Sequence, residues 1–114
     1  MAYDEELAHR MRCALEGIVG ISEKRMMGAL CFMLDGNMVG GATRSKNGIG
    51  QFLFRVGKEN EAEAEKLPGA EILTQGNKRM SGMFFVNEDD CDDEQMREWI
   101  SLSLSFVSTL PPKG

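Results

Sequence analysis

The chain has 114 residues, of which 42% are hydrophobic and 27% charged, and its formal net charge at pH 7 is −5. A chain of this length can build one core without disulfides or metals, so we expect a single domain over residues 1–114. The negative net charge disfavours direct binding to nucleic acid or to an anionic membrane, because either surface would repel the protein.

The three cysteines, Cys13, Cys31 and Cys91, stand far apart, which excludes a CxxC motif and a disulfide framework. Such sparse cysteine usage is typical of the reducing cytoplasm. The N-terminal residues lack the charged and then apolar order of a signal peptide, and no apolar run approaches the ~20 residues that a membrane-spanning helix needs. We therefore expect a cytoplasmic protein without membrane contact.

The first predicted element is a helix over residues 4–16. Leu7, Met11 and Leu15 recur at helical spacing and give this helix one apolar side. The linker that follows, residues 18–22, carries further apolar side chains that we expect to pack against a sheet.

A glycine-punctuated stretch, residues 27–57, predicts three consecutive strands. Apolar residues recur at every second position of its first and third strands, as they do where one side of a sheet faces a core. The side defined by this pattern carries Leu30, Phe32, Leu34, Phe52, Phe54 and Val56. The opposite side carries Ala29, Cys31, Met33 and Leu53, so both faces of the sheet need cover.

Turn residues separate these strands. Asp35 and Gly36 tolerate the positive φ angles of a tight hairpin, and a polar turn spans residues 44–48. Gly40 and Gly41 weaken the second strand, which indicates a bulge or the close approach of another backbone there.

The next segment, residues 58–67, predicts a short acidic helix in which Ala62 and Leu67 are the expected buried positions. A short strand at residues 72–73 and a last strand at residues 80–86 follow. The apolar residues of the last strand fall on both of its faces, and the side of the sheet to which each belongs stays unassigned.

A capping box, Asp92 to Gln95, begins a final helix that extends to about Leu110. The predicted fold is therefore α+β, in the order α-β-β-β-α-β-β-α, with helices flanking an antiparallel sheet. The expected main contributors to the core include Phe32, Phe54, Trp99 and Phe106.

Few residues of this chain are candidates for catalysis or for binding a metal. His9, the only histidine, falls on the polar side of the first predicted helix and is expected to be exposed. Cys31 lies in a strand and should pack as a small apolar residue, whereas Cys91 precedes a helix among acidic residues that oppose a thiolate. The acidic run at residues 87–94 lacks the ligand spacing of a calcium loop. The sequence thus predicts no catalytic, cofactor-binding or metal-binding residue.

Basic residues form the one candidate site. Two basic pairs each stand just before a predicted strand, and further basic residues lie within residues 27–57. Together they could bind phosphate or an acidic partner, and solvated strand ends are the alternative. The candidate patch comprises Lys24, Arg25, Arg44, Lys46, Arg55, Lys78 and Arg79. Its use for nucleic acid is disfavoured by the acidity of the chain and by the shortage of strand aromatics that could stack on bases.

The two-sided sheet also predicts an interaction surface. The predicted middle helix is short and rich in glutamate, so it can cover little of the second side, and nine methionines supply adaptable side chains. Monomers seldom expose a large apolar patch. We therefore expect this side to bind a protein partner, with a twofold homodimer as the simplest case.

The order and spacing of several motifs along nearly the whole chain resemble the TfoX (Sxy) N-terminal domain family. Two positions depart from the family pattern, since Met27 stands where an aromatic is expected and Met83 where a tryptophan is expected. The motifs are Ser22–Phe32 (SEKRMMGALCF), Asp35–Met38 (DGNM), Phe54–Gly57 (FRVG), Leu67–Ala70 (LPGA), Met80–Gly82 (MSG) and Phe106–Lys113 (FVSTLPPK).

The resemblance implies a bacterial α+β fold like that of secretion chaperones. In full-length regulators of this family the domain accompanies a C-terminal helical domain and acts with a partner transcription factor in the control of natural competence. The resemblance thus implies a stand-alone N-terminal domain, a non-enzymatic binding or regulatory module that acts through protein contacts and takes no cofactor. A small enzyme and a nucleic-acid-binding module that uses the basic edge of the sheet are the alternatives.

Overall fold

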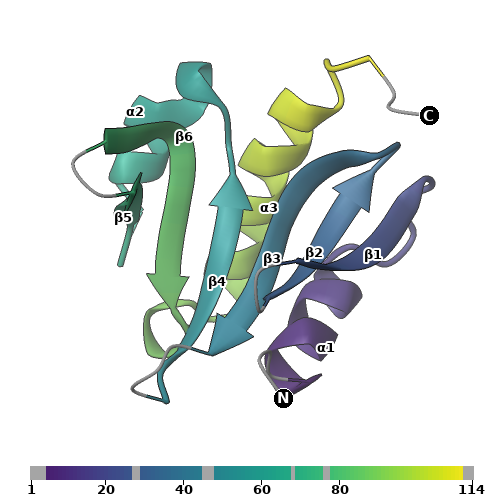
Figure 1. The fold of residues 1–114 in the computed structure, drawn as a ribbon, viewed down its shortest axis with the longest axis horizontal. Coiled ribbons are helices and arrows are strands. Elements are labelled where there is room, and N and C mark those ends of the chain that lie inside the picture. Colours follow the sequence, from purple (N-terminus) through teal and green to yellow (C-terminus); the bar gives the residue numbers. More distant parts are fainter. Residues whose placement is uncertain (1–4, 27–28, 45–47, 68, 76–77, 112–114) are drawn as a thin grey trace.

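The structure, a computed structural model, describes residues 5–26, 29–44, 48–67, 69–75 and 78–111, with the backbone alone described for residues 26, 73–75 and 78–81. Two short 3-10 helices, Lys58–Asn60 and Glu88–Asp90, join larger elements. These elements are α1 (Glu5–Ala14), β1 (Ile21–Met26), β2 (Ala29–Leu34), β3 (Asn37–Arg44), β4 (Gly50–Arg55), α2 (Glu61–Glu65), β5 (Glu71–Gln75), β6 (Lys78–Asn87) and α3 (Asp93–Val107) (Figure 1).

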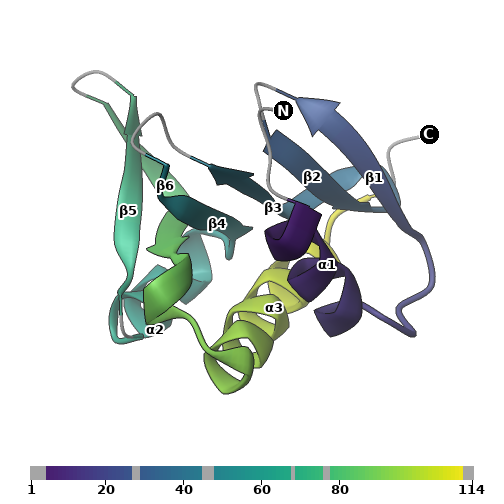
Figure 2. The ribbon, with the colours of Figure 1, turned by 90° about the horizontal axis from the view of Figure 1, so that it is seen from below.

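The six strands form one antiparallel sheet in the order β1-β2-β3-β4-β6-β5. Helices α1 and α3 lie side by side across the middle of the sheet (Figure 2). The predicted α+β class, with helices flanking an antiparallel sheet, is thereby confirmed. In the part of the chain that the structure describes, no helix is long and apolar enough to cross a membrane.

The predicted order of elements lacks one strand, β1. Ile21 and Ser22 were expected in the linker, and residues 23–26 were expected to lead into the first predicted strand. Instead, residues 21–26 pair with β2, from Ile21 opposite Leu34 to Met26 opposite Ala29. β1 is an edge strand in which the side chains of residues 22–25 are exposed, so it carries no alternating apolar pattern. Pairing with β2, rather than a pattern in its own residues, therefore identifies β1 as a strand.

The hairpin between β2 and β3 turns where the sequence predicts. Asp35 and Gly36 have φ angles of 51° and 84°, as the two central residues of a type I′ turn do. Phe32 then lies opposite Gly40 and Met33 opposite Met38, which leaves one extra residue in β3. This bulge confirms the predicted irregularity at the glycine pair.

The main core lies between the helices and the side of the sheet that alternation predicts. All six residues assigned to that side are buried. Trp99 of α3 stacks on Phe54, with ring centroids 5.1 Å apart, and contacts the ring of Phe84 at 5.6 Å. Phe106, predicted to be a main core residue, is only half-buried, because it lies in the last turn of α3 with the guanidinium of Arg55 over its ring. It therefore belongs to the margin of the core.

Three other predicted positions are wrong. Ala62 is exposed and Ala64 is buried in its place, because the 3-10 turn at Lys58–Asn60 shifts the side that α2 presents to the core. In the linker after α1, Ile18 and Val19 are 39% and 91% exposed, so they do not pack against the sheet.

The capping box begins α3 as predicted. The Asp92 side chain accepts a hydrogen bond from the Gln95 backbone N–H at 2.8 Å, and the Gln95 side chain accepts one from the Asp92 N–H at 3.1 Å. The helix ends at Val107, three residues before the predicted end at Leu110.

We expect an Asp92→Ala variant to lose about 1 kcal/mol of its free energy of unfolding, because the Gln95 backbone N–H at the start of α3 loses its acceptor. Urea denaturation followed by tryptophan fluorescence measures this loss. The neighbouring Asp93→Ala variant is the control, since Asp93 makes no capping bond, and equal losses in both variants would contradict the assignment.

Candidate functional site

The side of the sheet away from the helices is the candidate site. Helices α1, α2 and α3 all lie on one side, and the opposite side carries no described helix (Figure 2). The sheet is curved, and the outer hairpins β1–β2 and β5–β6 rise on the side away from the helices (Figure 2). The uncovered side is therefore the concave side of the sheet.

Strand register decides which side chains meet there. Residues directly opposite in antiparallel strands point to the same side of a sheet. One row across the uncovered side runs through the successive partners Lys24, Cys31, Gly41, Leu53, Phe85 and Glu71. An apolar centre thus lies between a basic residue on one edge strand and an acidic residue on the other.

We call the apolar part of this side the open face. It contains the predicted second-side residues, and register adds Met38 of β3 and two β6 residues that the sequence left unassigned. Cys31 is buried, and the other members are half-buried. The open face consists of Ala29, Cys31, Met33, Met38, Leu53, Met83 and Phe85. Apolar surface of this kind, without a helix over it, is typical of a protein-binding site.

The predicted basic residues lie on different strands and sides. Lys24 is exposed and shares the side of the open face, whereas Arg25, its neighbour in β1, lies opposite Leu30 and shares the side of the helices. Arg44 ends β3 and Arg55 ends β4, and because these strands are antiparallel, the two arginines lie at opposite ends of the sheet.

The contacts of these arginines also differ. Arg44 lies 3.9 Å from the Glu88 carboxylate and donates a hydrogen bond to the carbonyl oxygen of Gly48, while Arg55 lies over the ring of Phe106 at 5.3 Å. Lys46 lies outside the described residues. Lys78 and Arg79 pair with Gln75 and Thr74 in the β5–β6 hairpin, and their side chains are outside the described set. Among the described members, Lys24 and Arg25 are neighbours in β1 on opposite sides of the sheet, and Arg44 and Arg55 lie at its opposite ends.

Two of the three thiols are withdrawn from solvent. Cys31 is 3% exposed and Cys91 is 1% exposed. Burial raises the pKa of Cys31, and it raises the pKa of the Cys91 thiol to about 11, more than the nearby Arg10 guanidinium lowers it. At neutral pH both groups are neutral thiols and therefore poor nucleophiles.

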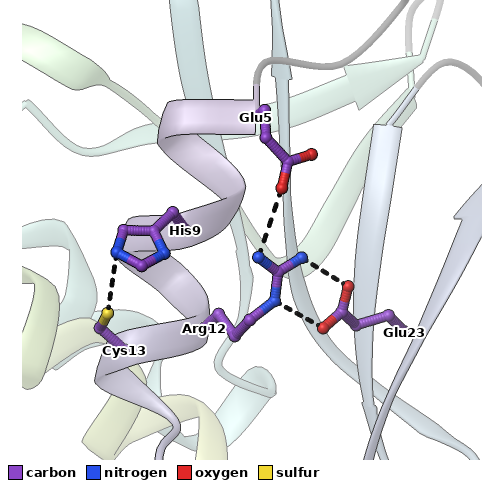
Figure 3. A network of polar contacts seen from close by, with 5 residues as sticks. All are labelled: Glu5, His9, Arg12, Cys13 and Glu23. Atoms are coloured by element: carbon purple, nitrogen blue, oxygen red, sulfur yellow. Dashed lines mark hydrogen bonds and ion pairs between the residues drawn. The ribbon is translucent and has the colours of Figure 1, made fainter.

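The outer surface of α1 carries a polar network (Figure 3). The Arg12 guanidinium donates to both oxygens of the Glu23 carboxylate, at 2.8 and 2.7 Å, and to Glu5 at 3.3 Å. These bonds lower the pKa of Glu23 and raise that of Arg12. The pair links α1 to the edge strand β1, although an exposed ion pair adds little to stability.

Residue types alone do not predict a second side-chain contact on α1, the one between His9 and Cys13. His9 is exposed, as predicted, and its Nε2 atom lies 3.5 Å from the Sγ atom of Cys13, which is also exposed (Figure 3). The spacing of four residues within a predicted helix is the signal that could have found this pair, because such residues share one side of a helix.

The TfoX N-terminal domain family model matches residues 14–107, which include all six strands, α2 and α3. No curated protein and no solved structure gives a significant match.

Proposed function

This chain belongs to the TfoX N-terminal domain family, and on that premise we propose that it is a binding module whose open face holds an apolar helix of a partner protein. The observation that carries the proposal is the apolar centre on the concave, helix-free side of the sheet. Under this proposal the module acts by binding its partner and does not catalyse a reaction.

The shape of the sheet favours a helix as the occupant. A helix with its side chains is about 10–12 Å across and is convex, so it can rest on a concave sheet along the direction of the strands. A second copy would present the same concave side and would meet the first copy mainly at the outer strands. The predicted homodimer through this side is therefore the alternative occupant, and it is distinguishable by experiment.

The charges at the two margins specify the partner further. A helix lying along β3 and β4 would have Lys24 on one flank and Glu71 on the other, since both residues are exposed at the ends of the same row. We infer a partner helix with an apolar stripe, acidic residues on the side toward β1 and basic residues on the side toward β5. Methionines on the open face, Met33 and Met83, adapt to the shape of that stripe.

We expect Leu53→Asp to weaken partner binding about tenfold or more, because it places a charge in the apolar centre of the contact. The partner is first identified by affinity purification from cells that produce the protein, and its affinity for purified variants is then measured by calorimetry. Val19→Asp is the matched control, because Val19 is 91% exposed and lies outside the open face.

A second variant, Lys24→Glu, tests the same contact in case Leu53→Asp does not fold. Lys24→Glu changes an exposed residue, and it should weaken binding by a smaller factor while leaving the melting temperature unchanged. Equal affinity of Leu53→Asp, Lys24→Glu and the parent would rule out the open face. Light scattering over a dilution series tests the alternative, since a dimer abolished by Leu53→Asp would identify a second copy as the occupant.

Control of natural competence is the finer role that family membership suggests. Under this proposal the bound helix belongs to a transcription factor or to a protein that acts with one. Sequencing of transcripts from cells with Leu53→Asp in place of the parent gene tests this role, and an unchanged set of competence transcripts would contradict it.

A further inference from the structure

The His9–Cys13 pair has the geometry of two metal ligands. Zinc binds imidazole nitrogen at about 2.0–2.1 Å and thiolate sulfur at about 2.3 Å in a tetrahedral arrangement, which places the two donor atoms roughly 3.6 Å apart. The observed separation between Nε2 and Sγ is 3.5 Å. The two donors therefore stand at the separation that a tetrahedral zinc ion requires.

The pair is accessible from solvent. His9 and Cys13 both line the depression between α1 and α3 and the one between α1 and the start of β1. Cys13 is the one exposed thiol among the described cysteines, whereas the other two are buried. An ion can thus reach this thiol without any opening of the core.

Two of the cations near the pair are already neutralised, whereas Arg97 of α3 also lines the depression between α1 and α3. The Arg12 guanidinium is bonded to two carboxylates, and Arg10 donates to Cys91 O at 2.6 Å and to the Asp93 carboxylate at 3.3 Å. Zinc binding replaces the proton of the Cys13 thiol, which passes to solvent, and the resulting thiolate adds one negative charge at the metal.

One chain supplies only half of a structural zinc site, which has four ligands. Among the described residues, no group of three or more His, Cys, Asp and Glu side chains is placed to hold a metal ion. A twofold axis through the ion would bring a second His9 and a second Cys13, which together give a Cys2His2 set.

Apolar surface next to the pair supports a second copy. Ile18 lines the same depression as His9 and Cys13, and it is 39% exposed, while the adjacent Val19 is 91% exposed. Two large aliphatic side chains beside the ligand pair would be covered when a second α1 approaches. We propose that His9 and Cys13 form half of a zinc site that a second copy of this chain completes, which gives a zinc-dependent homodimer.

Sedimentation velocity of the full chain, with and without Zn²⁺, tests this proposal. We expect a monomer in the presence of a chelator, a doubled mass with zinc, and one zinc ion for every two chains. Titration with Co²⁺ should give the absorption bands of tetrahedral cobalt bound to thiolate, with an end point at one cobalt ion for every two chains, a readout of ligation rather than of mass.

Cys13→Ser and His9→Ala should each abolish the zinc-dependent dimer. Glu16→Gln is the matched control, because Glu16 lines the same depression and should leave the dimer unchanged. The dimer should also persist in Leu53→Asp, which separates this proposal from binding at the open face. One zinc per chain without a change of mass, zinc binding that survives both ligand substitutions, or a dimer that persists in chelator would each overturn the proposal.

Discussion

The Phe54→Ala variant is expected to lose about 3–5 kcal/mol of its free energy of unfolding. Phe54 is fully buried, and its ring stacks on that of Trp99 with an interplanar angle of 9°. Truncation removes this contact and leaves a cavity between β4 and α3, which lie on opposite sides of the core. Urea denaturation with far-ultraviolet circular dichroism measures the loss without relying on the fluorescence of Trp99.

The matched control is Phe85→Ala, which removes the same side chain from the opposite side of the sheet. Phe85 is half-buried on the open face, so its loss should be about 1–2 kcal/mol, mostly from contacts with neighbouring strands. Losses of the same size at both positions would show that the two sides are equally covered, and the account of a helix-free side would then fail.

Gly40→Ala should destabilise the protein by about 1–3 kcal/mol or more, although it adds only one methyl group. The added Cβ atom would collide with the carbonyl oxygen of Leu53 and would also meet the Met11 side chain at 3.2 Å. The carbonyl belongs to β4, the neighbour of β3 in the sheet, so it cannot move without distortion of the strand pairing.

Gly41→Ala provides the comparison in the next position. There the nearest atom to an added Cβ is the Leu30 carbonyl oxygen at 3.0 Å, so a small shift relieves the contact. We expect a smaller loss than for Gly40→Ala in the same urea titration. A larger loss of stability for Gly41→Ala than for Gly40→Ala would contradict the assignment of the closest backbone contact to Gly40.

The sequence predicts those elements whose local chemistry and burial agree. Leu30, Phe32 and Leu34 alternate because β2 faces the helices on one side, and the Asp35-Gly36 turn has the residues that its positive φ angles require. The capping box predicts the start of α3 to the residue. In each case a few adjacent residues carry enough information to fix the local backbone.

Elements that depend on a neighbour are harder to predict. β1 has exposed side chains through most of its length, so only its pairing with β2 shows that it is a strand. In α2, the choice between Ala62 and Ala64 as the buried residue depends on a single 3-10 turn, which no pattern in a glutamate-rich segment reveals.

The sequence likewise predicts some features of the candidate site and not others. Alternation alone assigns Leu53 and Met33 to the second side of the sheet, which the register confirms. Whether basic residues on separate strands meet depends instead on sheet order and strand direction. Since β6 lies between β4 and β5, and Arg44 and Arg55 end antiparallel neighbours, proximity in the sequence is no guide to proximity in space.

The central claim, that the open face is the binding surface, is tested most directly by photocrosslinking in cells that produce the protein. A photoreactive phenylalanine analogue is placed at position 53, in the centre of the open face, or at position 101, which is exposed on α3. We predict a crosslinked partner at position 53, with the modified residue of the partner in a helix, and none at position 101. Crosslinking at position 101 alone, or equally at both positions, would contradict the claim.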